Sequence, residues 1–128
     1  MRYASLLLLF VLACAPMQNA GGSTVPLEDT RWTLAETGST ITLQFVDGSA
    51  VGSGGCNQYR ASYGAAGSKL TFGPAAATKR ACVEPERNRR ETEYFDALTK
   101  VASYAASAER LTLRDAAGAT LLEFDRQR

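Results

Sequence analysis

Short segments of alternating apolar and polar residues constrain this chain most. Residues 40–46 (TITLQFV) place isoleucine, leucine and phenylalanine on one face and polar residues on the other, which is the period of a half-buried β-strand. Asp47-Gly48 follows directly and is a strong signal for a tight hairpin turn. The same period recurs elsewhere, and we expect further strands at residues 31–35, 49–53, 57–63, 69–72, 111–113 and 121–124.

One segment has a helical period instead. Apolar residues within 94–102 recur at the spacing of one helix face, and we expect a helix at about 86–104. Pro85 suits its first turn, whereas Asn88 and Glu91 form an alternative cap and partner. Short strands, a single helix and no β-α-β alternation predict an antiparallel α+β fold, mainly β, or a partly closed barrel.

The strand pattern and the helix pattern together assign a set of apolar residues to one core. A chain of 128 residues, 45% hydrophobic and 21% charged, has the composition of one globular domain. We expect these residues to be mostly buried: Trp32, Leu34, Ile41, Leu43, Phe45, Phe72, Phe95, Leu98, Val101, Leu111, Leu113, Leu122 and Phe124.

Composition also excludes several classes of function. The formal net charge is +1, which argues against nucleic acid as the main partner because phosphate binding needs clustered surplus cations. There is no histidine, so Ser-His-Asp and Cys-His catalysis and His-ligated metals are excluded. Acidic residues are scattered, and no pair of them can be placed together. We therefore predict no catalytic residues, no metal and no cofactor.

The amino terminus explains the odd count of three cysteines. A short apolar run ends at Cys14, and its length suits a signal peptide better than a membrane-spanning helix. The preceding Val11-Leu12-Ala13 with Cys14 resembles the lipobox of bacterial lipoproteins, in which the cysteine carries the acyl chains. We expect a signal peptide at 1–13, lipidated Cys14 with a flexible tether at 14–25, and a folded domain at 26–128.

Two other interpretations of the amino terminus are ordinary secretion and a buried cytosolic segment. Ala13-Cys14-Ala15 has an A-x-A-like pattern for cleavage, but Pro16 would then follow the scissile bond and hinder the protease. For the lipoprotein, Ala15 in place of aspartate predicts sorting to the outer membrane, facing the periplasm, in a system like that of enteric bacteria. We expect the anchored protein to be a monomer.

Two motifs resemble a known family. Residues 52–59 (GSGGCNQY) and residues 78–82 (TKRAC), which follow Trp32-Thr33-Leu34 in this order, are similar to the META domain, also called the HslJ family, of bacterial envelope lipoproteins. The resemblance implies a strongly curved, barrel-like antiparallel sheet with one packed helix. It implies no established enzymatic activity and an association with envelope stress responses. Arg80 stands where the family usually has an apolar residue.

The glycine run and its neighbours have a structural and a functional interpretation. Residues 52–55 lack the Lys-Ser/Thr pair of a phosphate-binding loop, so we expect them to serve a bend in the sheet. Asn57 is expected to fix the adjoining turn. Asn57, Tyr59 and Tyr63 are also candidate interaction residues, and the tyrosines could alternatively line a ligand cavity. Residues 87–90 (RNRR), flanked by glutamates, predict a solvated helix start rather than a lipid-binding patch.

Cys56 and Cys82 remain as thiols once Cys14 is acylated. In an oxidising compartment pairing is the default, and neither cysteine has the C-x-x-C or histidine context of a redox or metal site. We predict a Cys56–Cys82 disulfide, with two separate buried thiols as the alternative. In the chain-entropy model, closing this loop stabilises the fold by about 3–4 kcal/mol.

These observations support two functional hypotheses. The first is a non-catalytic module, for interaction or stress support, that contacts an envelope protein or the cell wall. The second is a small barrel that binds an apolar ligand or inhibits a hydrolase through a loop. A large apolar cavity would favour ligand binding, whereas a filled core would favour binding through the surface.

Replacing Cys14 tests the anchor. We expect Cys14→Ser to abolish incorporation of labelled palmitate and to release the protein from membranes or leave it unprocessed, because stable anchoring needs several acyl chains. Equal fractionation of the two proteins, with no palmitate in either, would contradict lipidation.

Overall fold

A computed structural model describes residues 25–128 of the chain, so the predicted signal peptide, Cys14 and most of the tether lie outside the described residues. This described region contains one helix and nine strands. In chain order they are β1 (Thr30–Leu34), β2 (Thr42–Val46), β3 (Ser49–Ser53), β4 (Gln58–Ala66), β5 (Lys69–Phe72), β6 (Ala76–Ala77), α1 (Pro85–Lys100), β7 (Ser103–Ala106), β8 (Arg110–Arg114) and β9 (Thr120–Arg126).

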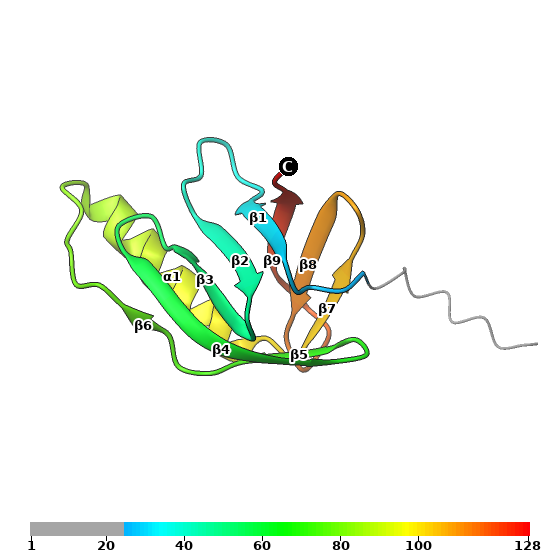
Figure 1. Ribbon diagram of the computed structural model, residues 1–128. Coiled ribbons are helices and arrows are strands. Elements are labelled where there is room, and N and C mark those ends of the chain that lie inside the picture. The colour runs from blue at the N-terminus through cyan, green and yellow to red at the C-terminus, as the bar shows by residue number, and fades with distance from the viewer. Residues whose placement is uncertain (1–24) are drawn as a thin grey trace, which may run out of the picture.

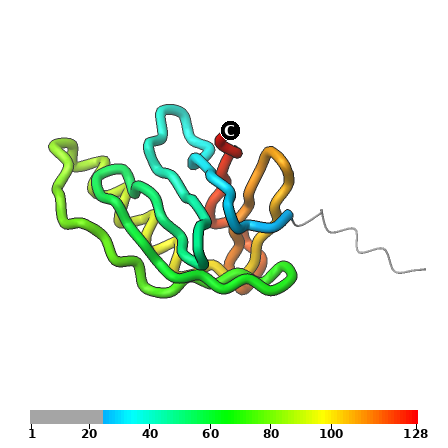
Figure 2. The backbone as a smooth tube through the Cα atoms, in the orientation of Figure 1, coloured from blue at the N-terminus to red at the C-terminus, as the bar shows by residue number. Residues whose placement is uncertain are grey.

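The strands form a single antiparallel sheet that closes into a ring. Their order is β3-β2-β1-β9-β8-β7-β5-β4-β6, and β3 also pairs with β4. The strongly curved sheet with one packed helix confirms the predicted fold class (Figure 1). Figure 2 shows the chain leaving β5, passing β4 as β6, and continuing beyond it before it returns as α1. The short strand β6 is therefore the one that lies outside the closed ring.

Helix α1 packs against residues of the curved sheet. Tyr94 contacts Tyr59 of β4 and Phe124 of β9 through edge-to-face ring contacts, and Leu98 is buried one turn later. The pattern that predicted this helix is thus the one that docks it. The interior is filled by large side chains with relative exposures below 2%: Trp32, Phe45, Phe124, Leu43, Leu70, Leu111 and Leu113.

Most of the predicted core is buried, with three exceptions. Phe72, Phe95 and Leu122 are only half-buried and pack against the edge of the core. Other buried residues lie outside that set of thirteen: Leu27, Ala50, Tyr59, Ala61, Leu70, Tyr94, Tyr104 and Ala106.

The predicted helix is too long at its carboxyl end. It ends at Lys100, and Val101 already has extended backbone angles. Residues 103–106 form β7, in which Tyr104 is opposite Leu113 of β8. Val101 and Tyr104 are both buried although they lie beyond the end of the helix, so apolar spacing alone does not mark the boundary. Strand pairing, a tertiary effect, decides it.

The helix of the described region is not long and apolar enough to cross a membrane.

Shortening Leu98 tests the docking of α1. Leu98 is 2% exposed, and Leu98→Ala should lower the free energy of unfolding by about 2–5 kcal/mol because a cavity replaces its side chain. Asp96→Ala, on an exposed position of the same helix, is the control and should change it by less than about 0.5 kcal/mol. Urea unfolding measures both, and equal midpoints for the two variants would refute the packing described.

Candidate functional site

The glycine run lets the backbone approach its neighbours closely. A Cβ added at Gly52 would lie 2.2 Å from the carbonyl oxygen of Thr42, and one at Gly54 would lie 2.8 Å from both Glu91 and Phe95. Gly55 has φ of +109°, a conformation that favours glycine. The glycines therefore allow the close approach of β3 to β2 and of the chain to α1, in agreement with the expected structural role of the run.

The side chain of Glu91 joins α1 to the sheet directly after this run. Its Oε2 accepts hydrogen bonds from the backbone N–H of Cys56 (2.9 Å) and of Asn57 (2.7 Å), and its Oε1 accepts one from Asn57 Nδ2 (2.5 Å). Glu91 is 7% exposed. A carboxylate buried to this extent is stable only with such donors.

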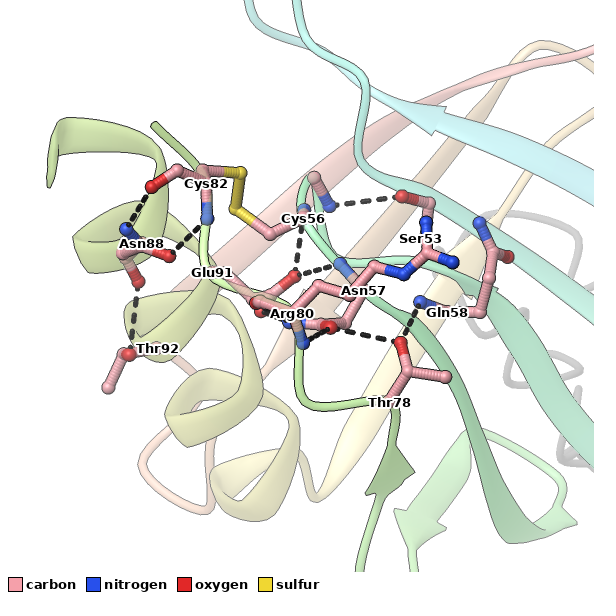
Figure 3. The surroundings of a disulfide bond; sticks show 11 residues. Ser53, Cys56, Asn57, Gln58, Thr78, Arg80, Cys82, Asn88, Glu91 and Thr92 are labelled. Carbon is pink, nitrogen blue, oxygen red and sulfur yellow. Dashed lines mark hydrogen bonds between the residues drawn. A yellow bond between two sulfur atoms is a disulfide. The ribbon is translucent and has the colours of Figure 1, made fainter. Parts of the chain in front are cut away.

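Asn57 connects the same cluster to the segment that leads into α1. Its Oδ1 accepts hydrogen bonds from Thr78 Oγ1 (2.9 Å) and the Arg80 N–H (2.6 Å), and its Nδ2 donates to the Arg80 carbonyl (2.9 Å) as well as to Glu91. Figure 3 shows this network around Asn57. All four hydrogen-bonding positions of the amide are therefore used within the chain. Asn57 fixes the local backbone and has none left for a ligand.

A disulfide joins Cys56 and Cys82 beside this network, with Cα atoms 5.5 Å apart (Figure 3). The side chain of Asn88 accepts a hydrogen bond from the Cys82 N–H and donates one to the Cys82 carbonyl. Asn88 therefore does not cap α1; Glu84 occupies the cap position without a side-chain cap bond. Hydrogen bonds to Asn57 and Gln58 hold the segment at residues 78–82 beside the start of β4. The disulfide to Cys56 fixes the end of this segment.

Sequence analysis missed the role of Glu91, which it grouped with the solvated charges around residues 87–90. The signal was present, because Glu91 precedes Tyr94 by three residues and Leu98 by seven and so lies on the apolar face of the helix. The neighbouring arginines do form exposed ion pairs, of Arg89 with Glu86 and Glu93 and of Arg90 with Glu36 and Glu93.

The two candidate tyrosines lie in different environments. The Tyr59 hydroxyl donates to the Thr42 carbonyl (2.8 Å) and lies 2.6 Å from the Tyr94 hydroxyl. Burial raises the pKa of both Tyr59 and Tyr94 well above the usual range. Tyr63 is at the edge of the core and donates to Glu28; burial, then the Glu28 carboxylate, raises its pKa to about 12. Tyr59 and Tyr94 thus bridge sheet and helix as neutral hydroxyls.

An open hollow lies across strands β2, β3, β4 and β6, and Tyr59 is one of its lining residues. It is a shallow, open groove of about 660 Å³. We call it the β2–β6 groove. Its lining residues are Thr42, Gln44, Val51, Gly52, Gln58, Tyr59, Arg60, Ala76, Ala77 and Thr78. Other hollows on the described residues have volumes of about 150–210 Å³.

A sequence comparison shows the family, and comparison with solved structures shows a shared fold. A model of the META domain family matches residues 25–128. The chain belongs to the META domain family. An NMR structure of a protein from Burkholderia xenovorans, 28% identical, superimposes with a TM-score of 0.66 over 88% of this chain and 99% of that one. A second NMR structure, 22% identical over 77% of this chain and 90% of that one, has a TM-score of 0.59 and shares the fold. No curated protein matches the chain.

The META domain is not a known enzyme family. Within residues 25–128, no three cysteine, aspartate or glutamate residues converge as a group able to hold a metal ion. The carboxyl group of Glu86 has a pKa below its usual range because the exposed guanidinium of Arg89 donates a hydrogen bond to it. This is an ordinary surface ion pair. Thr78 joins the β2–β6 groove to the polar network, because it lines the groove and its hydroxyl donates a hydrogen bond to Asn57 Oδ1.

Truncating Glu91 tests that network. Glu91→Ala should lower the free energy of unfolding by at least about 2 kcal/mol, because three donors lose a charged acceptor. Glu91→Gln keeps one acceptor oxygen, so its free energy of unfolding should lie between those of Glu91→Ala and the wild type. Glu93→Ala, which removes an exposed carboxylate on the same helix, is the matched control, and urea unfolding is the measurement. A loss for Glu91→Ala no larger than for Glu93→Ala would show that the buried carboxylate does not hold the helix.

Proposed function

We propose that this protein is a non-catalytic interaction module of the bacterial envelope. Cys14 anchors it to the outer membrane, and the META domain faces the periplasm and engages a partner through the β2–β6 groove. The lipobox-like residues before Cys14 support the anchor. The Cys56–Cys82 disulfide supports an oxidising compartment, because such bonds persist there and are rare in the cytosol.

One observation supports binding through the surface: large side chains fill the inside of the ring, and an open groove of about 660 Å³ lies across its strands. Trp32 and Phe45 are fully buried inside the ring, together with Phe124. An apolar ligand enclosed within the sheet would have to displace these side chains, at a cost of several kcal/mol. The groove is open and already formed, so a partner can dock without rearranging the core.

A second candidate, inhibition of a hydrolase through a loop, is favoured by Val83. This side chain is 95% exposed and follows Cys82, whose disulfide fixes the loop. A rigid loop that presents an apolar residue loses little conformational entropy when it binds.

Site-specific photo-cross-linking in intact cells distinguishes these surfaces. A photoreactive amino acid would replace Gln44 in the groove, Val83 on the loop, or Glu123 on β9 across the ring. We expect adducts from Gln44 that are absent from Glu123, and we expect them to disappear when Ala77→Trp fills the groove. Unfolding of the Ala77→Trp variant checks that its fold is intact.

Two outcomes would redirect the proposal. Adducts from Val83 that persist in the Ala77→Trp variant would establish the loop as the binding surface instead. Equal adducts from Gln44 and Glu123, unchanged by Ala77→Trp, would refute a role for the groove.

A further inference from the structure

The β2–β6 groove presents polar side chains without partners. In the described part of the chain, Gln44, Gln58 and Arg60 line the groove, and their side-chain groups make neither hydrogen bonds nor ion pairs. The floor between them consists of small residues, among them Gly52 and Ala77. The groove therefore combines a flat floor with free amide and guanidinium donors.

Arg80 is not one of the lining residues of the groove, but it adds a second cation near one of them, Gln58. Asn57 holds its backbone N–H and carbonyl, and in Figure 3 its side chain points from the disulfide toward Ser53 and Gln58. Between residues 25 and 128, its guanidinium has no carboxylate partner. The nearby carboxylate of Glu91 is buried and bonded to Cys56 and Asn57. Arg60 and Arg80 are therefore both free to pair with an external anion.

We propose that the β2–β6 groove binds a linear glycan that carries carboxylate groups. This inference rests on the proposed function and names the class of partner. The guanidinium groups of Arg60 and Arg80 would pair with carboxylates, while the amides of Gln44 and Gln58 would hydrogen-bond to sugar hydroxyls. Because these contacts are exposed to solvent, the binding should be weak and should weaken further with salt.

The shape of the groove favours a glycan over an acidic peptide. The groove crosses four strands instead of following one strand edge, so an occupant would not extend the sheet as an added strand. Peptide partners usually insert aromatic or aliphatic anchors into pockets, and the small floor residues Gly52, Ala76 and Ala77 form no deep apolar pocket. A flat, hydroxyl-rich polymer needs none.

Calorimetric titration of the purified full chain in neutral detergent tests the inference. The probes are oligogalacturonate, the same oligomer with its carboxylates methyl-esterified, and oligoglutamate of equal length. We expect oligogalacturonate to bind most tightly and its affinity to fall with added salt. Arg60→Gln and Arg80→Gln should each weaken binding by about threefold to fivefold, as expected for exposed charge pairs.

Arg87→Gln is the matched control, because it removes an exposed arginine outside the groove with the same change of charge. Its affinity should stay within about twofold of wild type. Amide NMR shifts should locate the bound oligomer, with changes at Gly52 and Gln58 and none at Gly118, which lies in the β8–β9 turn.

Three results would overturn the inference: tighter binding of oligoglutamate, equal binding of the methyl-esterified oligomer, or equal losses in Arg87→Gln and Arg60→Gln. Each would refute the glycan as the occupant. None of them would change the interpretation of the cross-linking at Gln44, because that experiment tests the groove as a binding surface independently of the identity of its ligand.

Discussion

The buried carboxylate of Glu91 bonds helix α1 to the sheet at the point where the glycine run bends it. Desolvation of a carboxylate is costly, and the cost is offset because Cys56 and Asn57 supply three hydrogen bonds to it. A Cβ at Gly54 would collide with this side chain. The helix, the bend and the start of β4 therefore depend on one another, since none can shift without breaking the same set of bonds.

The same network shapes the surface. Asn57 extends it from Glu91 to Thr78 and Arg80, and the disulfide holds Cys82 beside Cys56. The strand β6 has only two residues, Ala76 and Ala77, paired with β4, and a pairing this short is marginal without support. The network supplies that support from its carboxyl-terminal side. The network of Glu91 and Asn57 thus helps to position the β6 side of the groove.

Local patterns predicted much of this fold. The alternation in residues 40–46 and the turn at Asp47-Gly48 correspond to the observed β2–β3 hairpin, since both features act over a few residues. The pattern failed at the end of the helix. Val101 is buried and continues the helical spacing, although its backbone is already extended and β7 begins at Ser103. Glu91 was missed for a related reason. A charged residue on an apolar face is interpretable only when its partners, here from another element, are known.

By itself, the sequence determined the mainly antiparallel fold with one helix, the family, and the two domain cysteines that pair. These follow from short-range periodicity, turn residues and recognisable motifs. The tertiary structure alone decided that the sheet closes through β3 and β4, that Glu91 is buried, and that Gln44, Arg60 and Ala77 line one groove. Those relations join residues far apart in the chain, and hydrogen bonding and packing between separate elements establish them, which no local pattern encodes.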